Sequence, residues 1–166
     1  MLEPGREGLL RVRYDTQKRK EWGLLFEDIR FMTNDSANPE KSFTLSLSIL
    51  EDPASLTEEQ RQLAPVVSLD KGTHSFGSIM HGDTVLAVVT LRNSGKSPLV
   101  IRRIFSSCDC IRFDKVSEEI MPGNALKINV MMFTDELLGP QHKVLNIVTN
   151  DPFNQLIRFS FMGFVR

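Results

Sequence analysis

Alternation of apolar and polar residues along the second half of the chain predicts β-strands. In the segment 125–132 every second residue is apolar, namely Leu126, Ile128, Val130 and Met132. The segment 83–93 alternates in the same way and stops at the turn residues 93–95. A period of two residues is typical of a strand with one buried face. Short strands separated by Gly, Pro and Asn predict a mainly β chain with an immunoglobulin-like antiparallel β-sandwich.

Landmarks in the first fifty residues recur in the same order in the last fifty. They are Pro4-Gly5 with Pro122-Gly123, Gly23 with Gly139, and Thr33-Asn34-Asp35 with Thr149-Asn150-Asp151. The shift is 118 residues for the first landmark and 116 for the other two, because one loop of the earlier copy is two residues longer. Matching landmarks in a fixed order predict a repeated structural unit.

The earlier copy lacks the front half of the later one. Residues 71–121 precede the Pro-Gly turn of the later copy, whereas only residues 1–3 precede that of the earlier copy. The segment 9–14 places Leu10, Val12 and Tyr14 on one face, which predicts a strand.

We therefore expect residues 1–50 to be the C-terminal half of an immunoglobulin-like unit and residues 66–166 to be a complete one. Three strands with an uncovered apolar face need a covering layer to be stable in water. Either a segment of the natural protein or another chain would supply the missing layer. The half unit would pair with another chain, accept a donated strand or pack against the complete unit. The sequence thus predicts a protein partner or self-association through the half unit, with a homodimer as one form.

Residues 51–65 interrupt the strand pattern. Ser55 followed by Glu58 is a capping-box arrangement, and Pro65 ends the segment that follows. A helix of about two to three turns needs packing to be stable. We expect a linker with a short helix between the two β units.

Composition and motifs exclude several classes of function. The 20 Lys and Arg residues are balanced by 21 Asp and Glu, so no basic excess favours a nucleic-acid partner. The sequence shows no apolar stretch that predicts a transmembrane segment and no signal peptide at residues 1–10. It contains no nucleophile elbow, phosphate-binding glycine loop or His-Glu-x-x-His motif. We expect no enzymatic activity and no cofactor.

Cys108 and Cys110 are the candidate site residues. In a straight strand their Cα atoms would be about 6.6 Å apart, at the upper edge of what a disulfide spans, so a bridge between them would require a bulge. We interpret them as structural thiols, since free cysteine packs as a small hydrophobe. The alternative is a soft-metal site, for example for Cu(I), or a thiol-redox pair. Zinc is disfavoured because no further paired Cys or His motif accompanies them.

Trp22 supports a second alternative. It lies beside Gly23 in the long loop of the half unit. A tryptophan ring can stack on a sugar, which would make the chain a glycan-binding module, although a single tryptophan at a hairpin more often packs over its own sheet.

Several of these residues together resemble a known family. They are Ser75-Phe76-Gly77, Asn93-Ser94-Gly95 with Pro98-Leu99, Ser107-Cys108-Asp109-Cys110, and Pro122-Gly123. Over residues 71–166 this order resembles the bacterial family called domain of unknown function 1573. The chain departs from it at Asp109, where the family has glycine, and at Ile111, where it has threonine. Glycine permits a sharp bend between the cysteines more readily than aspartate.

The resemblance implies an immunoglobulin-like sandwich in an exported or envelope protein of Gram-negative bacteria. From it we expect a non-catalytic interaction or structural module in the periplasm or cell envelope.

Overall fold

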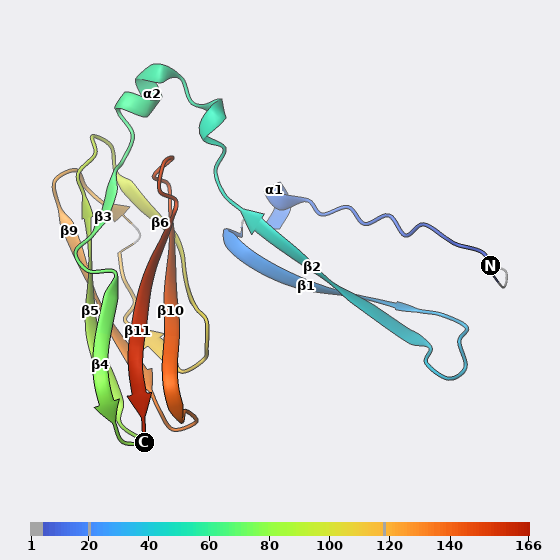
Figure 1. The fold of residues 1–166 in the computed structure, drawn as a ribbon. Helices are drawn as coiled ribbons and strands as arrows, with labels where there is room; N and C mark the ends of the chain where they lie inside the picture. Colours follow the sequence, from blue (N-terminus) through green and yellow to red (C-terminus); the bar gives the residue numbers. More distant parts are fainter. Residues whose placement is uncertain (1–4, 20, 118) are drawn as a thin grey trace.

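Residues 67–165 form a β-sandwich in the computed structural model of the protein (Figure 1), which describes residues 5–19, 21–117 and 119–166. One sheet has five strands in the order β4-β11-β10-β6-β8. These strands are β4 (Thr73–Ile79), β11 (Leu156–Val165), β10 (Gly139–Thr149), β6 (Leu99–Ser106) and β8 (Glu119–Ile120). The other sheet has the order β3-β5-β9-β7. Its strands are β3 (Val67–Leu69), β5 (Thr84–Asn93), β9 (Ala125–Phe133) and β7 (Ile111–Phe113).

The predicted mainly β, immunoglobulin-like fold is confirmed. Every paired strand in the sandwich is antiparallel to its neighbours except β4, which runs parallel to β11.

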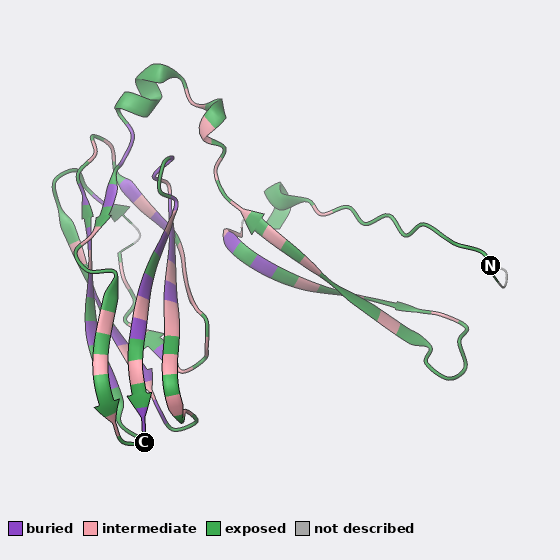
Figure 2. Cartoon of the chain, in the orientation of Figure 1, coloured by how far each residue is buried: buried purple, intermediate pink, exposed green. Residues whose placement is uncertain are grey.

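The core lies between the two sheets and follows the alternation in the sequence. On β5 the buried residues are Val85, Ala87, Val89 and Leu91, and on β9 they are Ile128, Val130 and Met132. Phe159 and Phe161 of β11 face them with their ring centroids 5.2 Å apart. Figure 2 shows the buried positions as bands along these strands. Removing this apolar surface from water is the main stabilising term of the sandwich.

Two buried polar residues hold strands and loops of the sandwich together through hydrogen bonds to the backbone. Asn93 donates from Nδ2 to the carbonyl oxygens of Ser97 (2.9 Å) and Ile120 (2.8 Å). Asp151 accepts a hydrogen bond from the backbone N–H of Val67 at 2.8 Å. Both side chains are almost fully buried, so these bonds also satisfy groups that would be costly to leave unpaired.

The linker contains two short helical turns, and its predicted cap was wrong. A 3₁₀ turn covers Pro53–Ser55, and α2 covers Glu58–Gln62. Thr57, and not Ser55, is the N-cap: its hydroxyl accepts from the Gln60 N–H (3.2 Å), and Gln60 Oε1 accepts from the Thr57 N–H (2.8 Å). The Ser55 hydroxyl instead donates to the carbonyl oxygen of Asp52. Ser55 and Thr57 have the same capping chemistry and lie two residues apart. Because Ser55 is part of the 3₁₀ turn, Thr57 is the residue that caps α2.

The first part of the chain forms a two-stranded antiparallel hairpin. Its strands are β1 (Gly23–Met32) and β2 (Glu40–Ile49), preceded by the four-residue helix α1 (Thr16–Arg19). The strand predicted at residues 9–14 is absent: this segment pairs with nothing among the described residues, and Leu10 and Val12 are exposed. An extended segment becomes a strand only when another strand accepts its backbone hydrogen bonds. Figure 1 shows the hairpin projecting from the sandwich.

Candidate functional site

The β1–β2 hairpin has the same register as the β10–β11 hairpin of the sandwich. In the first, pairing runs from Gly23↔Ile49 to Met32↔Glu40. In the second it runs from Gly139↔Val165 to Val148↔Leu156. Adding 116 to each number of the first hairpin gives the second, at all ten cross-strand pairs. Strand register is set by side-chain pattern and by the turn, so the two hairpins share both.

The turns of the two hairpins are held by corresponding hydrogen bonds. Asp35 Oδ1 accepts from the N–H groups of residues 37 and 38 at 3.0 and 3.3 Å. Asp151 Oδ1 accepts from those of residues 153 and 154 at 2.9 and 3.2 Å. Across the turn, the Thr33 N–H donates to the Pro39 carbonyl oxygen (2.7 Å), as Thr149 N–H does to that of Gln155 (2.8 Å).

The glycine landmarks of the sequence also correspond. Gly23 and Gly139, which begin β1 and β10, have φ of 83° and 76°. Gly5 and Gly123 have φ of 73° and 78°, while Pro4 lies outside the described residues. A positive φ favours glycine because it lacks a Cβ. The first landmark pair thus shares its glycine conformation, although the structure does not describe its first proline.

The two hairpins differ in what surrounds them. In the sandwich, β6 pairs with β10, β4 pairs with β11, and the sheet of β5 and β9 covers the apolar face. Neither edge of β1–β2 pairs with another strand among the described residues. Phe43 is 40% exposed, whereas its counterpart Phe159 is 2% exposed.

One face of the β1–β2 hairpin is apolar. It carries Leu25, Glu27, Ile29 and Phe31 from β1, and Lys41, Phe43, Leu45, Leu47 and Ile49 from β2. We call this set the open face. The opposite face of β2 presents only polar side chains, those of Glu40, Ser42, Thr44, Ser46 and Ser48. Perfect alternation in "SFTLSLSI" was the signal that could have identified the open face residue by residue from the sequence.

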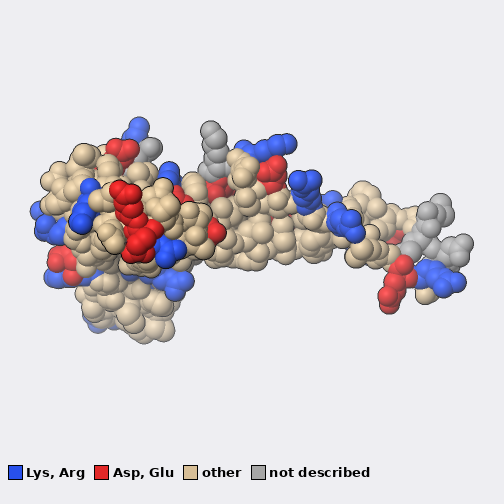
Figure 3. All heavy atoms as spheres, turned by 90° about the horizontal axis from the view of Figure 1, so that it is seen from above, with Lys and Arg blue, Asp and Glu red and all other residues tan. Residues whose placement is uncertain are grey.

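The base of the hairpin is attached to the outside of the sandwich. Arg103 donates from its guanidinium to the Trp22 carbonyl oxygen at 3.1 Å. Gly23 fits closely against Phe105 and Val148, where a Cβ would come within 3.0 Å of both side chains. Leu25 is buried at this contact, but the open face becomes more exposed toward the tip. In Figure 3, Lys, Arg, Asp and Glu are mixed over the sandwich, while uncharged side chains dominate the projecting hairpin.

Trp22 has a partner within the protein. The Arg102 guanidinium lies 5.1 Å from the centroid of its ring and also donates from Nε to Glu51 Oε1 at 3.1 Å. Glu51 in turn exchanges two backbone hydrogen bonds with the Gln155 side chain. One aromatic face that a sugar would use is therefore occupied by a cation, an arrangement with its own favourable energy.

Cys108 and Cys110 form a disulfide, which corrects the argument that geometry disfavours one. That argument assumed an extended strand, but residues 107–110 form a turn between β6 and β7, and the Cα atoms are 5.2 Å apart. Closure of so short a loop contributes roughly 1.6 kcal/mol in the chain-entropy model, against about 3 kcal/mol for fifteen residues. The disulfide therefore contributes little to the stability of the fold.

The disulfide lies beside a surface depression of about 620 Å³. Its lining includes Arg112 and three acidic residues, namely Asp109, Asp135 and Glu136. Ser106 Oγ lies 3.9 Å from Cys108 Sγ. No group of three or more His, Cys, Asp and Glu side chains that could hold a metal occurs among the described residues. Binding of a soft metal by the two sulfurs would first require their reduction, since thiolates are the ligands.

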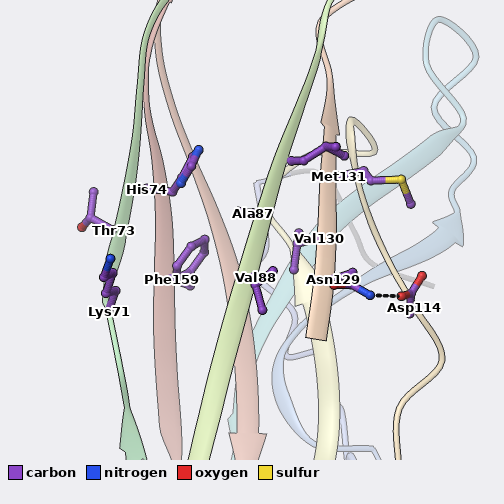
Figure 4. A pocket seen from close by; sticks show the side chains of 11 residues that line it. Lys71, Thr73, His74, Ala87, Val88, Asp114, Asn129, Val130, Met131 and Phe159 are labelled. Atoms are coloured by element: carbon purple, nitrogen blue, oxygen red, sulfur yellow. Dashed lines mark hydrogen bonds between the residues drawn. The ribbon is translucent and has the colours of Figure 1, made fainter. Parts of the chain in front are cut away.

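Another depression, of about 640 Å³, lies between β4 and the sheet of β5 and β9 (Figure 4). Lys71, Thr73 and His74 line one side of it, and Asp114 lies on the other, hydrogen-bonded to Asn129 at 2.8 Å. A catalytic histidine of the Ser-His-Asp type is oriented by a carboxylate within hydrogen-bond reach. His74 and Asp114 are separated by β5 and β9 in this view, so the depression does not assemble such a pair.

The family model described as "Protein of unknown function (DUF1573)" matches residues 67–165. A search of curated proteins finds no match. None of the helices in the described part of the chain is long and apolar enough to cross a membrane.

Two solved structures share the fold. A crystal structure of a protein of unknown function from Porphyromonas gingivalis W83 matches with a TM-score of 0.66 at 19% identity, over 85% of this chain and 66% of that one. Since the sandwich makes up less than two thirds of the chain, this match extends beyond it. The ASH/PapD-like domain 7 of human CEP192 matches with a TM-score of 0.51 at 13% identity, over 74% of this chain and 96% of that one.

Proposed function

Because the chain belongs to the family described as "Protein of unknown function (DUF1573)", we propose that it is a non-catalytic, immunoglobulin-like interaction and structural module of a bacterial cell-envelope protein. Its contact surface is the open face of the β1–β2 hairpin together with the two free edges of that hairpin. Residues 1–50 are, in this proposal, the C-terminal half of a second unit in tandem with the sandwich.

The observation that carries the proposal is the shared register of the two hairpins in different surroundings. Phe31 and Phe43 are 38% and 40% exposed, while their counterparts Ile147 and Phe159 are 0% and 2% exposed. A two-stranded hairpin with an exposed apolar face is marginal in water. Its free edges offer unpaired backbone groups that another strand can bind.

The sandwich indicates which strands would complete the half unit. β10 is bordered by the antiparallel β6, and β11 by the parallel β4. By correspondence, the free edge of β1 takes an antiparallel strand and that of β2 a parallel one. Segment 9–14 corresponds to β9 and would join the facing layer, with Leu10, Val12 and Tyr14 turned inward as Ile128, Val130 and Met132 are.

When the chain is alone, a second copy is the partner that its open face fits. Ile29 and Phe43 are directly paired across the hairpin, with Glu27 two residues toward the base and Lys41 two residues toward the tip. A two-fold axis through this pair, perpendicular to the strands, brings Glu27 of each copy toward Lys41 of the other. Within the chain Glu27 already pairs with Arg19 (3.3 Å) and Lys41 with Asp35 (2.8 Å), so the apolar centre and not these charges supplies the attraction between copies. The face of one hairpin is smaller than the roughly 800 Å² per partner of a standard interface, so we expect weak association.

Sedimentation velocity on the full chain over a range of concentrations tests the surface. We expect concentration-dependent self-association that Phe43→Ser reduces at least tenfold in affinity, because a buried aromatic ring is lost from the interface. Phe26→Ser is the matched control: Phe26 is more exposed, at 66%, but lies on the opposite face of the same hairpin. It should leave association unchanged.

Equal effects of the two substitutions would mean that exposed aromatic rings aggregate without using the open face. A chain that stays monomeric at every concentration would remove self-association from the proposal. Amide exchange of the hairpin in the presence of envelope extract, compared between Phe43→Ser and Phe26→Ser, would then test binding of another polypeptide.

The envelope location rests on the family resemblance. Fractionation of the bacterium that produces the full-length protein, followed by detection with an antibody against the sandwich, tests it directly. Recovery in the periplasmic or membrane fraction is expected, and recovery in the cytosolic fraction would contradict it.

A further inference from the structure

The Cys108–Cys110 turn is held in place by hydrogen bonds that do not involve sulfur. It lies where the chain crosses from β6 in one sheet to β7 in the other. At its start, Ser107 N–H donates to the Val144 carbonyl oxygen, and Ser107 Oγ accepts from the Val144 N–H, both at 2.9 Å. At its end, the Phe133 N–H donates to the Cys110 carbonyl oxygen at 2.9 Å. The turn is thereby attached to both sheets.

These bonds keep the two sulfurs within reach of each other whether or not they are joined. The Cα separation of 5.2 Å lies inside the range that a disulfide spans. Reduction therefore leaves a preorganised pair of thiols, and the sandwich does not need the bridge to close a long loop. A disulfide whose cleavage costs the fold little is suited to exchange, because its oxidised and reduced forms share one backbone.

We propose that Cys108–Cys110 is a stoichiometric thiol–disulfide exchange site that oxidises a dithiol carried by a positively charged peptide segment. Both cysteines are only partly buried and border the depression of about 620 Å³. Asp109, Asp135 and Glu136 outnumber Arg112 in its lining. The resulting negative potential concentrates a cationic peptide at the bridge. The Lys or Arg side chains of that peptide lower the pKa of its own thiol and so supply the attacking thiolate.

The exchange proceeds in two displacements. The substrate thiolate attacks Cys110 Sγ, the S–S bond breaks, and its electron pair goes to Cys108 Sγ, which lies 3.9 Å from the Ser106 hydroxyl. The Ser106 hydroxyl donates to the Cys108 carbonyl oxygen and accepts from the Cys108 N–H, which holds this residue in place, and a proton from solvent neutralises the released sulfur. The second substrate thiolate then attacks the substrate sulfur of the mixed disulfide and expels Cys110 as a thiolate, which solvent protonates. The substrate loses two electrons and two protons, and the protein gains them as two thiols.

The test uses the folded full chain and two synthetic dithiol peptides of equal length, one rich in lysine and one rich in glutamate. Thiols are counted by alkylation and mass spectrometry, while circular dichroism follows the fold. We expect oxidation of the lysine peptide about tenfold faster than that of the glutamate peptide, and an unchanged β-sheet spectrum after reduction. The difference should fall toward twofold in the Asp135→Asn, Glu136→Gln double variant.

The attacked sulfur is located by quenching the reaction with acid and mapping the mixed disulfide. The proposal requires the peptide on Cys110. A lysine-rich peptide with a single cysteine lacks the second attacking thiol, so it should accumulate this adduct on the wild-type protein. A bridge that is reduced only after denaturation, equal rates for the two peptides, or adducts mainly on Cys108 would each overturn the proposal.

Discussion

The β1–β2 and β10–β11 hairpins present one backbone arrangement in two environments. Their cross-strand pairs and turn hydrogen bonds correspond residue by residue, yet one is enclosed by a sandwich and the other extends from it. Local pattern and turn chemistry are thus sufficient to specify a hairpin. Burial is a separate matter, because it depends on strands distant in the sequence or on another molecule.

The difference in burial between the two hairpins also determines whether their apolar surface stabilises the fold or remains available for binding. At Phe159 the apolar surface is already removed from water within the chain, whereas at Phe43 much of it still contacts solvent. Burying a phenylalanine side chain is worth about 2 kcal/mol or more. In β10–β11 this free energy stabilises the fold, and in β1–β2 it is available for binding.

Substitution of the corresponding phenylalanines should give the largest contrast. Phe159→Ala should lower the free energy of unfolding of the sandwich by about 3–5 kcal/mol, because it leaves a cavity in the core. Phe43→Ala should change that free energy by less than about 0.5 kcal/mol, since surface changes have small effects. Denaturant unfolding followed by circular dichroism measures both. A large loss in Phe43→Ala would show that the open face is already packed within the chain.

Substitution of the two turn aspartates should give a smaller contrast. Asp151 is 2% exposed and accepts hydrogen bonds from the backbone at Val67, Phe153 and Asn154. Asp151→Ala should cost about 2–3 kcal/mol of unfolding free energy, because buried N–H groups lose their acceptor. Asp35→Ala should leave sandwich unfolding unchanged and only speed amide exchange at residues 37 and 38. Similar losses in both variants would mean that hairpin and sandwich unfold as one unit.

The features that were predicted correctly from the sequence are those that the local residue pattern determines. Alternation identified the buried residues of β5 and β9, and the recurrence of Gly23 as Gly139 located the starts of the two corresponding strands. Sequence-based prediction was wrong where a contact with a residue distant in the sequence determines the local structure. Residues 9–14 have a strand pattern but lack a strand to pair with, and the bend at Cys108 depends on hydrogen bonds to Val144 and Phe133.

In the linker, the local sequence did not identify the residue that caps α2. Ser55 and Thr57 both have capping chemistry, and only the three-dimensional path of the chain selects Thr57. The open face was within reach of the sequence, since Phe43 and Leu45 alternate strictly with serine and threonine. Its lack of a covering layer was inferred from the repeat and not from these residues.

The smallest expected effect concerns the charge of the exposed hairpin turn. Lys41 Nζ lies 2.8 Å from Asp35 Oδ2, and this hydrogen bond, followed by those from the N–H groups of Ala37 and Asn38, lowers the pKa of Asp35. The pKa in the folded hairpin is therefore below that of the unfolded chain. The stabilisation of the turn is complete above the unfolded pKa and is lost as the pH falls through the lowered, folded value.

Lys41→Met should raise the pKa of Asp35 toward its ordinary value and make the turn loosen at a higher pH. An NMR titration of the Asp35 carboxyl carbon and of the amides of Ala37 and Asn38 measures this. Lys127→Met removes the same charge from β9 and should leave the titration unchanged. If the two variants shift it equally, net charge rather than the Lys41 contact sets the pKa. In that case the resemblance between the two turns rests on backbone hydrogen bonds alone, because Asp151 holds its turn through N–H donors.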